Sequence, residues 1–140
     1  MAAQFFDLVD DYTQDPPKRD AIEQGAHFGC AVEFTAADIV GTTAADWLAR
    51  MQIRRKLADL DGDGAPLLDL DSDAIGGLTL TVADTVAGTV RVEVSVDGDD
   101  TDVLPIGKAF RYDMELVRVA DDYERRVAEG KVQVRGRVTR

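Results

Sequence analysis

The chain has 140 residues, 45% of them hydrophobic, which is enough for one domain with its own core and too few for two domains of ordinary size. Its 16 basic and 27 acidic side chains give a net charge of -11, which argues against nucleic-acid binding, since basic side chains must neutralise phosphates. No apolar run approaches the ~20 residues of a membrane-spanning helix, and no signal-peptide pattern is present. One cysteine and one histidine exclude a disulfide framework and leave little room for metal or triad chemistry based on them.

Residues 1–17 carry apolar side chains at the three- and four-residue intervals of one helical face. These side chains are Phe5, Leu8, Val9 and Tyr12, with Phe6 widening the same face. Two prolines, Pro16 and Pro17, then end any helix. We predict that this segment is an assembly arm or short helix and that its five apolar residues contact a partner. The alternative is an arm folded back on its own domain.

Between residues 18 and 140 apolar and polar residues alternate, which places one face of a strand on a core. The pattern predicts strands at residues 26–34, 47–53, 78–82, 90–96, 110–116 and 132–138, with weaker strands at 21–24, 67–70 and 123–127. The side chains expected in the core are Phe28, Cys30, Trp47, Met51, Leu80, Val92, Val94, Tyr112, Met114 and Val134.

Glycine and aspartate clusters separate most of these runs. They predict turns at residues 61–64, 76–77, 97–100 and 129–130. Residues 36–46 are small and rich in threonine and alanine, so we expect a loop or helical turn there. Roughly eight short strands without a long helical period between them predict an all-β fold, an antiparallel sandwich or barrel, forming a single domain over residues 18–140.

One acidic segment resembles a calcium-binding loop. Its residues Asp59, Asp61, Asp63 and Gly64 match the first three ligand positions and the glycine of that loop. Position twelve, however, is Leu70 instead of glutamate, and the flanks are predicted strands where a calcium hand has helices. An acidic turn is the favoured interpretation, and calcium binding is the alternative. Further oxygen donors would be Asp69, Asp71 and Asp73.

Other chemistry has little support in the sequence. His27 falls on the polar face of its strand and Cys30 on the core face, so we expect a surface histidine and an unreactive thiol. The motifs of nucleotide-binding and hydrolytic enzymes are absent. Trp47 is expected in the core and not on a sugar-binding face. With 27 acidic residues, pairs of neighbouring carboxylates arise by chance, so no pair indicates a glycosidase site. We therefore expect no catalytic residue, no cofactor and no metal.

Short motifs in a fixed order extend over residues 25–139. They are ARMQIR at 49–54, LDL at 68–70, IGGLTL at 75–80, GTV at 88–90, LPIG at 104–107, YDMEL at 112–116 and EGKVQV at 129–134. In this order the chain resembles the small β-sandwich proteins of bacteriophage tail gene clusters, in particular the N-terminal domain of siphophage upper baseplate proteins. The chain departs from that pattern before Pro16 and in its longer connection at residues 36–46.

The resemblance implies an immunoglobulin-like sandwich and a non-enzymatic adaptor of the virion, built into a tail or baseplate in several copies and made in the bacterial host cytoplasm. Its partners would be other tail or baseplate proteins, with no nucleic acid and no membrane. Any receptor-binding domain is expected on another chain. Two other functions stay open: a calcium-dependent or carbohydrate-binding sandwich module, and a small hydrolase using surface carboxylates.

Overall fold

Two main sheets and a two-stranded hairpin form in a computed structural model that describes residues 4–5, 7–55, 66–73 and 75–136. The larger main sheet contains six strands. The strands are β1 (Gln4–Phe5), β4 (Ile22–Glu23), β6 (Trp47–Arg54), β7 (Leu68–Asp71), β10 (Gly107–Arg118) and β11 (Tyr123–Arg135). Their order is β1-β11-β10-β6-β7, and β4 also pairs with β11. The pairs among β6, β7, β10 and β11 are antiparallel, whereas β1 and β4 run parallel to β11.

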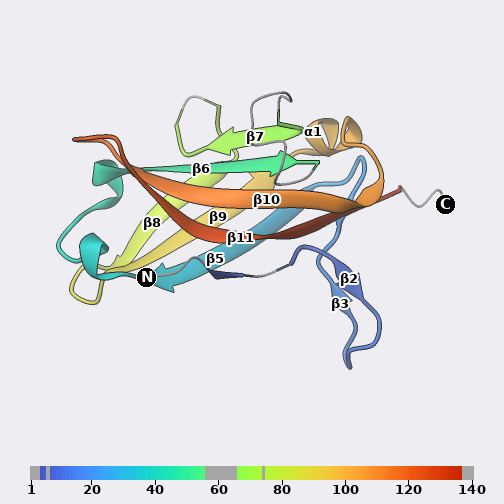
Figure 1. Ribbon diagram of the computed structural model, residues 1–140, viewed down its shortest axis with the longest axis horizontal. Coiled ribbons are helices and arrows are strands. Elements are labelled where there is room, and N and C mark those ends of the chain that lie inside the picture. The colour runs from blue at the N-terminus through green and yellow to red at the C-terminus, as the bar shows by residue number, and fades with distance from the viewer. Residues whose placement is uncertain (1–3, 6, 56–65, 74, 137–140) are drawn as a thin grey trace.

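The smaller sheet has the order β5-β9-β8 and is antiparallel throughout. Its strands are β5 (Phe28–Thr35), β8 (Leu78–Asp84) and β9 (Thr89–Val96). Figure 1 shows β6, β10 and β11 in front of β5, β8 and β9, so the chain is a two-layer β-sandwich. The predicted all-β sandwich is confirmed.

Short elements connect the two sheets. Residues 36–46 contain two 3-10 turns, η1 (Ala37–Ile39) and η2 (Ala44–Asp46), as predicted for this connection. The predicted turn at residues 97–100 instead begins the helix α1 (Gly98–Asp102). In the described part of the chain, no helix is long and apolar enough to cross a membrane.

The core lies between the sheets and consists of the alternating side chains that the sequence pattern selects. Eight of the ten predicted core residues are buried: Phe28, Trp47, Met51, Val92, Val94, Tyr112, Met114 and Val134. The other two, Cys30 and Leu80, are partly buried and pack against the same core. Each fully buried aliphatic or aromatic side chain stabilises the fold by roughly 1.5–3 kcal/mol relative to its exposure to water.

One predicted turn, at residues 129–130, is wrong. Gly130 pairs with Tyr112 in the middle of the β10–β11 ladder, so the predicted strands at 123–127 and 132–138 are one strand. The ladder shifts register between Met114 and Glu115, which places an extra residue in β11 near this point. Gly130 itself lies in a regular stretch of the ladder, between the pairs Phe110–Val132 and Met114–Ala128, and does not reverse the chain.

The alternative of a short helix within residues 1–17 is also wrong for the described part of this segment, residues 4–5 and 7–17. β1 pairs with Ala128 and Glu129 of β11, and Leu8 continues the same parallel register opposite Val132. The Leu8 N–H donates to the Lys131 carbonyl at 2.8 Å, and the Gln133 N–H donates to the Leu8 carbonyl at 2.9 Å. A helix this short is marginal in water, whereas the extended segment satisfies backbone groups along the edge of β11.

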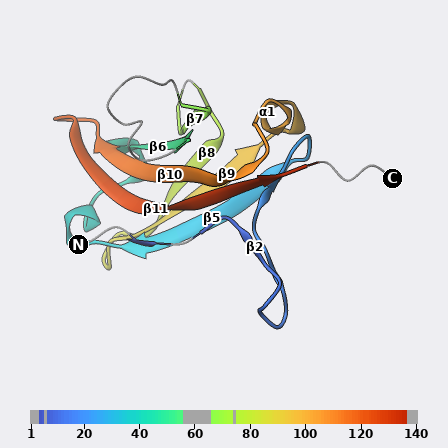
Figure 2. The ribbon, with the colours of Figure 1, turned by 45° about the vertical axis from the view of Figure 1, so that its right-hand side comes forward.

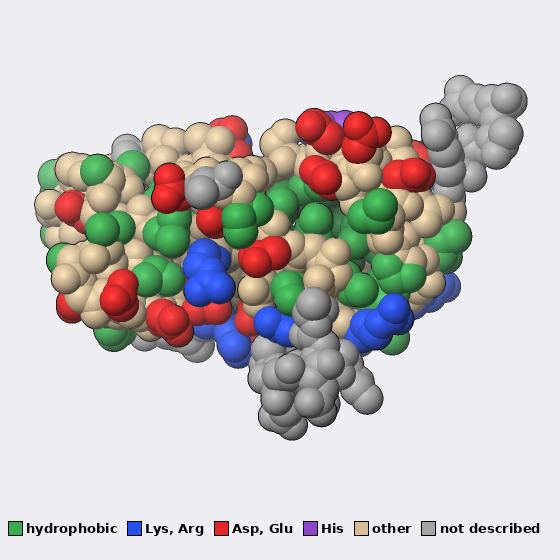
Figure 3. Space-filling model, turned by 90° about the horizontal axis from the view of Figure 1, so that it is seen from above, with side chains coloured by type: hydrophobic (Ala, Val, Ile, Leu, Met, Phe, Trp, Pro, Cys, Tyr) green, Lys and Arg blue, Asp and Glu red, His purple; other side chains and the backbone are tan. Residues whose placement is uncertain are grey.

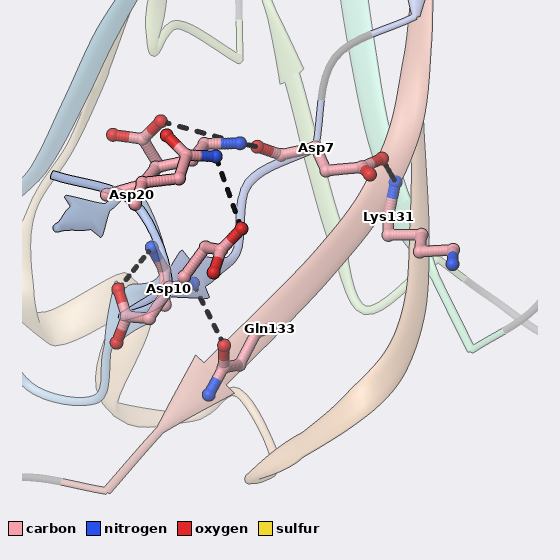
Figure 4. A network of polar contacts seen from close by, with 9 residues as sticks. Asp7, Asp10, Asp20, Lys131 and Gln133 are labelled. Carbon is pink, nitrogen blue, oxygen red and sulfur yellow. Dashed lines mark hydrogen bonds and ion pairs between the residues drawn. The ribbon is translucent and has the colours of Figure 1, made fainter.

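Two aspartates fix this N-terminal strap, residues 4–5 and 7–11, to the sheet (Figure 4). A carboxylate oxygen of Asp7 accepts from the Lys131 N–H at 2.9 Å, and one of Asp10 accepts from the Ala21 N–H at 3.2 Å. The Asp10 N–H donates to the Gln133 side chain at 3.0 Å. Leu8, between these anchors, is 3% exposed and belongs to the core. The strap is therefore part of the sandwich, and the described residues match the alternative of an arm folded back.

A hairpin leaves the strap before the chain returns to β11. It consists of β2 (Asp10–Asp11) and β3 (Lys18–Arg19), and it projects from the body of the sandwich in Figure 2. The proline pair lies in this hairpin, where the Asp15–Pro16 peptide bond is cis. The chain reverses between β2 and β3, in the segment that contains the prolines, and no helix precedes them in the described residues.

Leu8→Ala is expected to destabilise the fold by about 3 kcal/mol, because it leaves a cavity in a well-packed core. Tyr12→Ala is the matched control, since Tyr12 is 63% exposed on the hairpin and its loss should change stability by less than about 1 kcal/mol. Denaturant titration followed by circular dichroism measures both. Equal stability of the two variants would contradict the placement of Leu8 in the core.

Candidate interaction site

The single histidine and the single cysteine lie where their strand parity predicts. His27 is exposed and its Nε2 lies 2.9 Å from the hydroxyl of Ser95. Cys30 is partly buried, and burial, helped by the charge of Asp20, raises the pKa of its thiol to about 11. The thiol therefore stays protonated at neutral pH, which disfavours a nucleophilic role.

Trp47 is buried, as predicted, and its indole N–H donates to the Thr42 hydroxyl at 2.8 Å. The guanidinium of Arg118 lies 5.9 Å from the Trp47 ring and 5.0 Å from the ring of Tyr123. Tyr123 is 47% exposed. With the tryptophan in the core and an arginine over both rings, these aromatics do not form an open platform for a sugar.

The calcium-like residues Asp59, Asp61, Asp63 and Gly64 lie outside the described residues. Among the possible further donors, Asp71 is engaged in a turn: one of its carboxylate oxygens accepts from the N–H groups of Asp73, Ile75 and Gly76 at 2.9–3.0 Å. Burial opposes ionisation of Asp71, but these backbone donors outweigh it and lower its pKa. Within the described ranges, no three His, Cys, Asp or Glu side chains form a group that could hold a metal ion.

Two carboxylates with perturbed acidity lie on the outer face of β10. Burial raises the pKa of Asp113, although the charge of Arg126, whose Nη2 lies 3.5 Å from the carboxylate, opposes the rise. Burial and the charge of Asp113 also raise the pKa of Glu115. Arg126 also pairs with Glu129, its Nη1 lying 3.1 Å from that carboxylate, so Asp113 belongs to an ion-pair network across the sheet.

The edge strand β5 offers a different kind of site. In an antiparallel sheet, the backbone N–H and C=O groups of successive residues point alternately to the two sides of the strand. Those of Ser95 point to the β8 side of β9, where the Ser95 N–H donates to the Gly77 carbonyl. Gly29, which lies opposite Ser95, must therefore direct its own N–H and C=O away from β9. The same parity applies to Ala31, Glu33 and Thr35. Among the described strands, none pairs with this side of β5.

The first half of this edge borders a cleft of about 480 Å³. β5 contributes Phe28, Cys30 and Ala31 to the lining, and the strap contributes Leu8. Charged side chains line it as well, namely Arg19, Asp20, Glu23 and Arg135. Arg135 Nε also lies 3.7 Å from the buried carboxylate of Asp10. The cleft thus combines apolar and charged side chains with a strand edge that no described strand pairs with, and extended peptide segments bind at such edges by strand addition.

The five residues predicted to bind a partner do not form one surface. Leu8 is buried in the core, Val9 is half-buried, and Tyr12 is exposed on the projecting hairpin. Phe5 lies in β1, whose side chains are not described, and Phe6 lies outside the described residues. Leu8 is therefore wrong as a partner contact, because it is buried. Tyr12 stays a candidate contact. The guanidinium of Arg19, which lines the cleft, lies 6.0 Å from the ring of Tyr12.

Acidic side chains gather around α1, at one end of the molecule (Figure 3). Asp97, Asp99 and Asp102 line a second cleft there together with two glycines. These carboxylates add negative charge to this part of the surface.

The alternation of apolar and polar residues predicts the strand β5 but does not show that this strand lies at the edge of its sheet. An edge and a central strand have the same alternation, as β5 and β9 do here. The hairpin at residues 10–19 carried a clearer local signal, because an Asp-Pro-Pro run favours a turn.

No protein-family model matches the chain, and no curated protein matches it. One solved structure with a similar backbone is that of the NK cell receptor Nkp44, a triggering partner in natural cytotoxicity. The two share 12% identity with a TM-score of 0.40, and the alignment covers 96% of this chain and 100% of the other. A similarity at this level has no bearing on the function of this chain.

Cys30 is expected to react slowly with a thiol reagent in the native protein. A pKa of about 11 in place of 9.0 lowers the thiolate population at pH 8 about a hundredfold, and the thiolate is the reactive form. Reaction with an aromatic disulfide reagent, followed by absorbance, measures the rate, and the same reaction in denaturant is the control. Equal native and denatured rates would contradict the burial of this thiol.

Proposed function

We propose that this chain is a non-enzymatic assembly protein that acts through protein–protein contacts. The observation that carries the proposal is the edge of β5, whose outward backbone groups have no partner strand among the described residues. An unpaired edge is a template for strand addition by another chain. The neighbouring cleft adds room for side chains of the added segment.

The particular assembly in this proposal is a bacteriophage tail or baseplate. Its support is the order of the sequence motifs over residues 49–134, which resembles that of siphophage upper baseplate proteins. In this role the chain is an adaptor present in several copies, made in the host cytoplasm and incorporated into the virion, with other tail or baseplate proteins as partners. A sugar- or calcium-binding module has less support, because Trp47 is buried and Asp71 is engaged in a turn.

Co-expression with the products of the genes on either side of its own tests this function. We expect a complex with a tail or baseplate protein that survives size-exclusion chromatography. Ala31→Pro should abolish the complex, because it removes an outward N–H without touching the β9 ladder. Ala31→Val keeps that N–H and should leave the complex intact.

Two results would contradict the proposal. Neighbouring genes that encode no virion proteins would remove the tail or baseplate assignment. A complex that forms equally well with Ala31→Pro would show that strand addition at β5 is not the mode of binding.

A further inference from the structure

We propose that β5 pairs with the β5 strand of a second copy of this chain, antiparallel and about a two-fold axis. This inference deepens the proposed assembly function, on which it rests, by naming a second copy as a partner that uses the same β5 edge, in competition with any other added strand. Such a contact would join two three-stranded sheets into one continuous sheet across the dimer.

β5 differs from the other sheet edges in length and regularity. β1 and β4 have two residues each and β7 has four, whereas β5 has eight in an uninterrupted register with β9. β8, at the far edge of the same sheet, carries a register irregularity between Val82 and Asp84. Short strands and irregularities protect edges from pairing, as do lysine and proline, and β5 has none of these devices.

The outward positions of β5 are self-complementary in one register. When Ala31 lies opposite the second copy's Glu33, Gly29 lies opposite its Thr35, and all four outward residues of each copy find a partner. An antiparallel ladder of this length has about eight hydrogen bonds, since each such pair exchanges two. A shift by two residues in one direction loses a pair and sets Glu33 against Glu33, which is unfavourable. A shift in the other direction also loses a pair.

The outward residues of β5 itself do not obstruct this contact, and the charged side chains of Arg19 and Asp20 line the cleft beside the first half of the strand. The side chains at Gly29, Ala31, Glu33 and Thr35 are exposed on the outer face of the sheet, and three of the four are small. Glu33 is the one charged residue of β5, and its β9 neighbour is Arg91. In the register that pairs Ala31 with Glu33 of the second copy, Glu33 lies opposite a neutral alanine, so the dimer interface contains no directly opposed like charges.

Long-range electrostatics set the conditions of the contact. Two chains with a net charge of -11 repel each other, and salt screens this repulsion over about 10 Å at 0.1 M ionic strength. We therefore expect the dimer to become tighter as salt is raised. The short-range pairing at β5 supplies the attraction that does not depend on net charge.

The test is sedimentation velocity over a concentration series with charge variants at Ala31. Ala31→Glu sets two new carboxylates against Glu33 of the opposite copy and should weaken the dimer roughly tenfold. Thr79→Glu is the matched control: Thr79 and Ala31 are both exposed, and both lie opposite Glu93 of β9, but Thr79 is on the far edge strand. This control should leave the dimer unchanged.

The register is tested by reversing the charges. Ala31→Lys, compared with Thr79→Lys, should tighten the dimer by a similar factor at low salt. In the double variant Ala31→Glu with Glu33→Lys, the opposed charges attract again and the dimer should recover. Thermal melts of each variant check that the exposed substitutions leave the monomer folded.

A wild-type chain that remains monomeric at every concentration would overturn the proposal. So would a dimer that Thr79→Glu weakens as much as Ala31→Glu. If the chain stays monomeric but binds a tail or baseplate protein in an Ala31-dependent manner, self-pairing is wrong while the proposed assembly function stands.

Discussion

The outer edge of β11 needs hydrogen-bonding partners along a strand of 13 residues, and much of the architecture follows from how they are supplied. The N-terminal strap pairs with the middle of this edge through β1 and Leu8, and β4 pairs with its end at Val134 and Arg135. Between these pairings the chain makes its projecting hairpin. Because the strap belongs to the larger sheet, it covers β11 and leaves the facing edge strand β5 without a partner in the described residues.

The strands themselves were predictable because alternation is a local property. Valines at every second position of β9 cannot share a helical face, and the structure buries all four of them. The strap was not predictable in this way. Its apolar spacing fits a helix, but the conformation is decided by backbone groups of β11 that lie more than a hundred residues away in sequence, such as those of Lys131 and Gln133. Local spacing contains no information on such a long-range partner.

The same limit applies to the candidate site. Parity placed His27 on the surface and Cys30 toward the core, and both predictions are confirmed. That Gly29 and Ala31 direct backbone groups away from β9, where no described strand pairs with them, depends on the order β5-β9-β8, which no single strand encodes. Gly130 shows the converse error: a glycine that reads as a turn in isolation is a paired residue once β10 lies beside it.

An open edge and a high net charge act at different ranges, and together they make association selective. Repulsion between acidic chains extends over a Debye length and opposes every encounter about equally. Backbone pairing acts at contact and requires a complete ladder in register, so a partner must align most of β5 before pairing outweighs the repulsion. Misaligned strands form too few hydrogen bonds to do so. In the proposed dimer, the -11 charge would therefore perform the protective role that lysine or proline performs on other edges, while a fully matched strand could still bind.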